Sequence, residues 1–238
     1  MGTNVLIIGA SGDIGKQIAI QLGHEGYSLI LHYYQNKTAI EAIQRELPRE
    51  GILDTIKADL TNQAGINRLL AGVAYPVDSI VFASGIAYYG LFQETPEQIM
   101  EEMLSIHVKA PLLISKEALP SMIKKKSGNI ILISSVWGEI GASYEVLYSA
   151  VKGSQISFVK ALAKEVGPSG IRVNAVSPGF IDTKMNPLSS DEKEQIVSEI
   201  PLNRPGTPQD VANVVSFLLS EKAGYIHGEV LRVTGGWV

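Results

Sequence analysis

Apolar, strand-like runs alternate with helical patterns along the whole chain, and this alternation restricts the fold more than any other feature of the sequence. Strands are predicted near residues 4–8, 28–33, 54–57, 78–83, 129–134, 171–176 and 229–233. Helices are predicted near residues 13–25, 37–47, 62–72, 96–126, 145–167 and 208–221. Such alternation produces a parallel sheet covered by helices on both faces. The sequence therefore predicts an α/β fold with a doubly wound parallel sheet of about seven strands.

Length and composition favour one globular domain over residues 1–238, with no repeat and no linker. A net charge of −4 and the lack of a basic stripe argue against a nucleic-acid partner. The chain has no cysteine, which excludes disulfides and thiolate chemistry and fits a cytoplasmic location. We expect no metal site, because the four histidines lack metal-ligand spacing, and no membrane segment.

A glycine-rich turn follows the first predicted strand at once. The stretch GASGDIG places glycines at Gly9, Gly12 and Gly15, just before an amphipathic helical pattern. In a strand–turn–helix unit, backbone N–H groups at the helix N-terminus hold a pyrophosphate. Gly9 is expected to make the turn, Gly12 to let the phosphates approach, and Gly15 to let the helix pack closely. The turn therefore predicts a nucleotide-binding site.

Tyr148 and Lys152 lie four residues apart in the stretch YSAVK, and Ser135 ends the apolar run NIILISS. A tyrosine and a lysine one helical turn apart often form an ordinary surface pair. Here a buried strand would deliver Ser135 to the same sheet edge as the helix that carries the pair, so we expect the three side chains to converge. Such a trio suits proton transfer to an oxygen while a cofactor moves a hydride. The ammonium is expected to lower the phenol pKa from about 10.

The segment from residue 180 to 208 departs from this rhythm, because it is rich in proline, serine and charge. A short helical pattern lies within it, near residues 190–199. The segment follows the sixth strand and would lie at the strand ends where such sheets bind ligands. We interpret it as a substrate lid, and a variable surface excursion is the alternative.

Together these motifs resemble the short-chain dehydrogenase/reductase family, essentially from Asn4 to Trp237. The resemblance implies a Rossmann-like fold and a nicotinamide cofactor. It implies that Tyr148 protonates a carbonyl oxygen as hydride arrives, that Lys152 holds the nicotinamide ribose, and that Ser135 orients the substrate oxygen. It also implies a homotetramer built on the long helices near 96–126 and 145–167 and on the C-terminal strand.

Further motifs of this family extend the predicted cofactor site. ADL at 58–60 resembles the adenine-contacting strand end, and SPGFIDT at 177–183 resembles the Pro-Gly motif that holds the nicotinamide carboxamide. FASG at 82–85 stands where the family has NNAG. The predicted cofactor-binding residues are Gly9, Ser11, Gly12, Ile14, Gly15, Asn36, Lys37, Asp59, Leu60, Ser84, Gly85, Tyr148, Lys152, Pro178, Gly179, Ile181 and Thr183.

Two residues depart from the family pattern. Asp13 occupies the usual place of a glycine, and we expect it to cap the following helix and turn away from the pyrophosphate. His107 occupies the place of the asparagine that usually completes a catalytic tetrad and helps to hold a water in the proton path to the lysine. His107 is therefore a fourth catalytic candidate that would titrate near neutral pH. A structural role for this histidine is the alternative.

The end of the second strand bears on the cofactor. NAD-preferring relatives place an acid there for the ribose 2′-hydroxyl. Here the sequence HYYQNK has no acid, and Asn36 and Lys37 could meet a 2′-phosphate instead. The expected cofactor is NADP(H), and the expected reaction is the reduction of a ketone.

The overall match is to 3-oxoacyl-[acyl-carrier-protein] reductases, which dock an acidic carrier protein through basic residues near the active-site mouth. Lys126 matches one docking position, but Ser169 replaces the other. The stretch SSVWGEIGASYEVLYS, with His107, resembles more closely the elongation factor P 5-aminopentanone reductases of bacilli. In that case Glu139 and Glu145 could attract the terminal amine of the substrate, and ordinary surface acids are the alternative.

The protein partner implied by these resemblances is therefore acyl carrier protein or elongation factor P. A non-catalytic NADP(H) sensor or scaffold is the alternative from another class. A non-catalytic protein would be expected to have lost one or more residues of the Ser–Tyr–Lys set, but all three are present.

Overall fold

The computed structural model describes residues 3–185 and 189–238 and contains a seven-stranded parallel sheet in the order β3-β2-β1-β4-β5-β6-β7. The strands are β1 (Asn4–Ile8), β2 (Ser28–Tyr33), β3 (Ile52–Lys57), β4 (Ser79–Phe82), β5 (Gly128–Ile133), β6 (Ile171–Pro178) and β7 (Val230–Val233). The chain crosses over after β3, so the order reverses between β1 and β4. This doubly wound, Rossmann-like arrangement confirms the predicted fold class.

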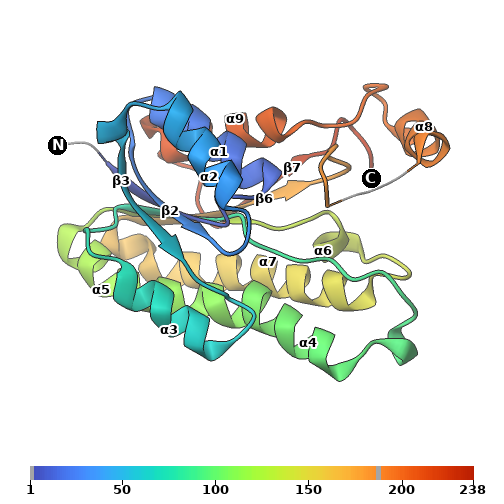
Figure 1. Ribbon diagram of the computed structural model, residues 1–238, viewed down its shortest axis with the longest axis horizontal. Coiled ribbons are helices and arrows are strands. Elements are labelled where there is room, and N and C mark those ends of the chain that lie inside the picture. Colours follow the sequence, from blue (N-terminus) through green and yellow to red (C-terminus); the bar gives the residue numbers. More distant parts are fainter. Residues whose placement is uncertain (1–2, 186–188) are drawn as a thin grey trace.

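Helices cover both faces of the sheet (Figure 1). The helices are α1 (Asp13–His24), α2 (Lys37–Glu46), α3 (Gln63–Gly72), α4 (Glu97–Leu104), α5 (Ala110–Lys125), α6 (Trp137–Ile140), α7 (Val146–Val166), α8 (Ser190–Glu199) and α9 (Pro208–Leu219). Short 3₁₀ turns span Arg49–Gly51, Phe92–Glu94, Gly167–Ser169 and Glu221–Ala223. Helices α1, α2 and α9 pack on one face, and α3, α5 and α7 pack on the other.

Successive residues of β1 point into opposite cores, as the two-residue period of a strand requires. Leu6 and Ile8 join the core beneath α3, α5 and α7, whereas Val5 and Ile7 join the core beneath α1, α2 and α9. All four side chains are at most 2% exposed. Burial on both faces explains why the strands are apolar at nearly every position.

The helix predicted over residues 96–126 is interrupted by a π-helical turn, Ser105–Lys109, between α4 and α5. Such turns are rare and occur frequently at functional sites. The turn carries His107, whose side chain is fully buried. Pro111, at the start of α5, lacks the N–H that an α-helix would use four residues after His107.

The expected lid, residues 180–208, includes residues 186–188, which lie outside the described residues. Its helical part forms α8, where Ser189 and Glu192 make a capping box. The lid role stays a prediction, as does the homotetramer. Among the described helices, none is both long and apolar enough to cross a membrane.

Candidate active site

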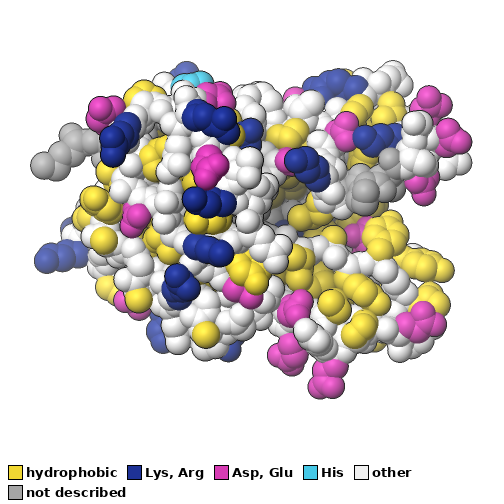
Figure 2. All heavy atoms as spheres, viewed as in Figure 1, with side chains coloured by type: hydrophobic (Ala, Val, Ile, Leu, Met, Phe, Trp, Pro, Cys, Tyr) yellow, Lys and Arg dark blue, Asp and Glu magenta, His cyan; other side chains and the backbone are white. Residues whose placement is uncertain are grey.

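A cavity of about 540 Å³ opens at the carboxyl ends of β4, β5 and β6. Its lining includes Ser84, Gly85, His107, Ser135, Glu145, Tyr148, Lys152, Pro178, Gly179, Ile181 and Thr183. Figure 2 shows hydrophobic side chains gathered at this end of the molecule, with acidic side chains above and below them. Because open parallel sheets bind ligands outside the carboxyl ends of their strands, this cavity is the candidate active site.

The structure brings Ser135, Tyr148 and Lys152 together at this cavity. Ser135 follows β5, and its hydroxyl oxygen accepts a hydrogen bond from the Trp137 backbone N–H at 3.2 Å. The same hydroxyl lies close enough to the Tyr148 phenol to influence its pKa. The Lys152 ammonium lies 5.5 Å from the centroid of the Tyr148 ring and donates to the Ile133 carbonyl at 2.8 Å. This geometry suits proton transfer at an oxygen held between the serine and the tyrosine.

Burial changes the ionisation of the trio. Desolvation lowers the pKa of Lys152 from 10.5 to about 7, because the side chain is only 4% exposed. The pKa of Tyr148 is raised by burial and by the negative charge of Glu145, and the nearby Ser135 hydroxyl opposes this only in part. The structure thus contradicts the predicted lowering of the phenol pKa. The ammonium is itself desolvated and is directed at the Ile133 carbonyl.

His107 lies against Tyr148, with ring centroids 5.8 Å apart in an edge-to-face contact. Its Nε2 atom is within hydrogen-bond distance of both the N–H and the carbonyl of Ile86, at 3.1 and 2.8 Å. Its Nδ1 atom is buried and has no partner within the described structure. Burial and the nearby Lys152 charge lower its pKa to about 3, so the predicted titration near neutral pH is wrong. His107 is a neutral donor or acceptor at physiological pH.

The glycine turn has the close contacts that its sequence predicts. Gly9 has a φ of +87°, and a β-carbon there would lie 2.6 Å from the backbone of Ser84. A β-carbon on Gly15 would overlap the Gly9 carbonyl oxygen. Gly12 is different, since a β-carbon there would meet only the Gly9 carbonyl oxygen at 3.6 Å. No side chain caps α1 at Gly12, so its first amides can face a pyrophosphate beside Ser11 and Ile14.

His32 supports this turn, although sequence reasoning did not select it. The Gly9 N–H donates to Nδ1 of His32 at 3.1 Å, so Nε2 carries the ring hydrogen and donates to the Ala58 carbonyl at 3.0 Å. Burial lowers the pKa of His32 to about 4, which keeps the ring neutral. One imidazole thus ties together the ends of β1, β2 and β3. The feature of the sequence that could have indicated this role is a histidine within the apolar second strand.

The residues predicted for the adenosine half lie outside the cavity, beyond the glycine turn. Asn36 caps α2 by accepting from the Ala39 N–H at 3.1 Å, and it donates to the Ser11 carbonyl at 3.2 Å. The exposed Lys37 ammonium lies 3.3 Å from Glu41.

Asp59 and Leu60 follow β3 on the same side of the sheet. The Asp59 carboxylate accepts hydrogen bonds from Thr61 and Asn62, and the Leu60 side chain is buried. Their cofactor role, and those of Asn36 and Lys37, stay predictions.

Asp13 does not cap α1, so that expectation is wrong. Gly12 is the N-cap residue and makes no side-chain cap hydrogen bond. Asp13 is instead the first residue of the helix, and its carboxylate accepts a hydrogen bond from the Lys184 N–H at 2.8 Å. Asp13 therefore links the glycine turn to the segment after β6.

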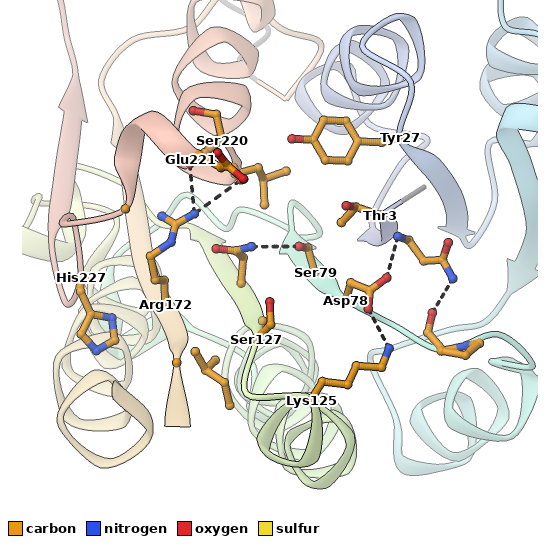
Figure 3. Close-up of a pocket in the computed structure, with 18 of the residues that line it drawn as sticks. Thr3, Tyr27, Asp78, Ser79, Lys125, Ser127, Arg172, Ser220, Glu221 and His227 are labelled. Atoms are coloured by element: carbon orange, nitrogen blue, oxygen red, sulfur yellow. Dashed lines mark hydrogen bonds and ion pairs between the residues drawn. The ribbon is translucent and has the colours of Figure 1, made fainter. Parts of the chain in front are cut away.

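A second, larger hollow of about 1660 Å³ lies at the amino ends of the strands, opposite the candidate active site (Figure 3). Several of its charged groups have partners within the protein. Lys125 pairs with Asp78 at 2.7 Å, and the Arg172 guanidinium donates to carbonyls at the end of α9, including that of Ser220 at 3.3 Å. We interpret these contacts as structural.

Comparisons with known proteins agree with this geometry. Residues 9–238 match the model of the family described as enoyl-(acyl carrier protein) reductase. The chain is 48% identical to the uncharacterized oxidoreductase YmfI of Bacillus subtilis over 100% of this chain and 99% of that protein. It is 36% identical to the 3-oxoacyl-[acyl-carrier-protein] reductase FabG of Staphylococcus aureus, over 99% and 98% of the two chains.

The crystal structure of a short-chain dehydrogenase/reductase from Brucella melitensis, described as a glucose/ribitol dehydrogenase, superposes with a TM-score of 0.90. It is 31% identical and covers 99% of this chain and 96% of that one. Members of this family use a nicotinamide cofactor, and the open glycine turn above fits one. The chain is an oxidoreductase that belongs to the short-chain dehydrogenase/reductase family.

Proposed function

We propose that this protein is an NADPH-dependent reductase of a ketone that carries a positively charged amine. Its proposed natural substrate is the 5-aminopentanone group on a modified lysine of elongation factor P. The choice of NADPH rests on the segment from His32 to Lys37, which has no acid to repel a 2′-phosphate. The observation that carries the choice of substrate is the position of Glu145.

Glu145 places a carboxyl group in the wall of the cavity, one helical turn before Tyr148. The residue is only 8% exposed, and burial raises the pKa of its carboxyl group. Tyr89 and Trp137 lie close enough to influence its pKa, and no lysine or arginine in the described part of the chain forms an ion pair with it. A buried carboxyl group without a cation is well suited to bind an ammonium group of the substrate.

The other acid of this stretch does not share that role. Glu139 forms an ion pair with Arg232 at 2.8 Å, so its charge is already compensated. The pKa of Glu139 is lowered by that partner. Of the two acids considered from the sequence, Glu145 therefore remains as the amine-binding candidate.

The reaction adds a hydride to the carbonyl carbon and a proton to the carbonyl oxygen. The bound cofactor supplies the hydride. Tyr148 donates the proton while Ser135 holds the oxygen, and solvent later returns a proton to the phenolate. The Lys152 ammonium stabilises the phenolate that forms, and the backbone around Pro178 and Gly179 lines the nicotinamide half of the site.

A second candidate is the reduction of 3-oxoacyl groups on acyl carrier protein, which the 36% identity to FabG proteins favours. An acidic carrier needs a basic surface near the cavity. Lys126 lies two residues before β5, at the opposite end of the strand from Ser135 and away from the cavity of its own chain. Helix α8, which contributes Glu192 to the cavity wall, instead carries the acids Asp191, Glu192, Glu194 and Glu199 and a single lysine, Lys193.

The direct test compares NADPH oxidation with ketone-bearing elongation factor P and with acetoacetyl carrier protein, using purified protein. The proposal expects a kcat/KM at least tenfold higher for the factor. A higher value for the carrier substrate would favour the second candidate. No turnover of either, with NADPH still bound, would favour a sensor or scaffold.

A matched pair of ketones tests Glu145. (5-Oxohexyl)trimethylammonium carries a fixed charge, and 7,7-dimethyloctan-2-one is its neutral isostere. Glu145→Gln should reduce the preference for the charged ketone about tenfold or more, as expected when a partly buried charge pair is lost. Glu165→Gln, an exposed acid on the same helix, is the control and should leave the preference unchanged. An unchanged preference in the Glu145 variant would remove this residue from substrate recognition.

A further inference from the structure

Gln155 lies directly behind the catalytic candidates and has no part in the reaction described so far. It is on α7, three residues after Lys152, and therefore on the same face of the helix. Its side chain is only 3% exposed. A buried amide must find partners for both its oxygen and its nitrogen, so its contacts report what surrounds it.

The two ends of this amide join Lys152 to His107. Oε1 of Gln155 accepts from the Lys152 ammonium at 3.5 Å, the outer limit of a hydrogen bond. Nε2 of Gln155 donates to the His107 backbone carbonyl at 2.9 Å. The opposite orientation would point N–H groups at the ammonium and oxygen at the carbonyl, so the surroundings fix the amide in one orientation.

Pro111 removes one donor that the His107 carbonyl would have in an α-helix. In an α-helix the carbonyl of residue 107 accepts from the N–H of residue 111, and proline has none. The π-helical turn Ser105–Lys109 lies at this point, and Gln155 supplies a donor from the neighbouring helix. Through the His107 ring, the connection continues to the backbone of Ile86 after β4.

We propose that Gln155 is a positioning residue, whose amide fixes the Lys152 ammonium and the π-helical turn as one hydrogen-bonded unit behind Tyr148. The unit gives Lys152 a second acceptor besides the Ile133 carbonyl, and this helps the buried side chain to keep its charge. It also holds the His107 ring against Tyr148. The link between Lys152 and the π-helical turn is therefore a side chain of the protein, which does not exchange with solvent as a bound water would.

The titratable groups around Lys152 are Tyr148 and, beyond it, Glu145 on α7, and His107 on the π-helical turn. If Lys152 must be an ammonium during reduction, kcat falls as the pH rises through its pKa. Removing the Gln155 oxygen should lower this pKa. A carboxylate at residue 155 should raise it by direct attraction.

The experiment compares Gln155→Met, which keeps the volume and removes both hydrogen bonds, with Gln155→Glu. The rate of reduction of (5-oxohexyl)trimethylammonium by NADPH is measured from pH 5.5 to 10. In the Met variant kcat should fall about tenfold, and the alkaline limb should move down by about one pH unit. In the Glu variant the limb should move up by about one pH unit or more, and KM for the ketone should stay within about threefold of wild type in both.

Val159→Ala is the matched control, because Val159 is buried one turn further along α7 and only packs. It should lower the melting temperature and leave the pH profile unchanged. The proposal would be overturned if the Gln155 variants lost stability but kept the wild-type alkaline limb of the kcat profile. It would also be overturned if the alkaline limbs of the two variants moved in the same direction. If the Met variant does not fold, the Glu variant alone decides. Failure of both to fold would assign Gln155 a purely structural role.

This inference uses the proposed reductase activity, and the two can fail separately. Wild-type protein that reduces no ketone would refute the proposed function. The charge of Lys152 can then still be followed without turnover, from the pH dependence of unfolding in urea. If the pH dependence of the free energy of unfolding shifts in opposite directions in the Gln155→Met and Gln155→Glu variants, the role of Gln155 is supported. Identical curves for the two variants would overturn it.

Discussion

Replacing Lys152 by methionine should stabilise the protein in mildly acidic solution and lose this advantage as the pH rises. The pKa of Lys152 falls from 10.5 in the unfolded chain to about 7 in the folded one, because burial disfavours the ammonium. The folded state therefore binds fewer protons than the unfolded state between pH 7 and 10.5. The cost of burying the charge is complete below pH 7 and disappears as the pH rises towards 10.5.

The magnitude follows from the two pKa values. A difference of 10.5 − 7 = 3.5 corresponds to about 5 kcal/mol at 1.36 kcal/mol per pKa unit. The remaining cost is about 2 kcal/mol at pH 9, so the change between pH 6 and pH 9 is about 3 kcal/mol. The methionine also leaves the Ile133 carbonyl without its donor, which costs about 1–3 kcal/mol at either pH. The net gain is about 2–4 kcal/mol at pH 6 and close to zero at pH 9.

Urea unfolding of both proteins at pH 6 and pH 9, at equal protein concentration and without cofactor, measures this change. Lys164→Met is the control, because Lys164 lies on the same helix but is exposed. The difference between the Lys152 variant and wild type should shrink by about 3 kcal/mol across this range. A difference that is constant with pH, or that grows with it, would refute the placement of a titrating lysine in the cavity wall.

Two further predictions concern the proposed reaction. Tyr148→Phe removes only the phenolic proton donor, so NADPH binding, measured by fluorescence titration, should survive while kcat falls about 10²- to 10⁴-fold. A wild-type kcat would mean that another group is the acid. Lys37→Glu places an acid at the start of α2, and the ratio of kcat/KM for NADPH to that for NADH should fall about 5- to 150-fold. An unchanged ratio would exclude Lys37 from the 2′-phosphate site.

The sequence predicted the sheet and the convergence of the trio because both depend on local patterns. Strand runs such as NIILI are apolar at each position, and a four-residue spacing places Tyr148 and Lys152 on one helix face. The π-helical turn was beyond such reasoning. Pro111 of α5 follows the turn, and Gln155 of α7 donates a hydrogen bond to the His107 carbonyl within it. The helical pattern of one segment of the sequence does not show a hydrogen bond that a residue of another segment donates to it.

The two electrostatic expectations that failed have one physical origin, the burial of the site. From the sequence we expected the lysine to lie near the tyrosine and the histidine to lie near both. The sequence does not show how far each of these side chains is buried from solvent in the folded protein. Desolvation lowers the pKa of His107 and Lys152 and raises that of Tyr148. Glu145 raises the Tyr148 pKa further.

This arrangement has a consequence for the proposed reaction. A substrate ammonium bound at Glu145 would neutralise the charge that makes Tyr148 a weaker acid. The phenol pKa would then fall as the correct substrate enters, and proton donation would become easier. A neutral ketone would leave Glu145 uncompensated and Tyr148 poorly acidic. Under the proposed function, Glu145 would therefore favour a cationic ketone in kcat as well as in KM, and the matched ketone pair separates the two effects.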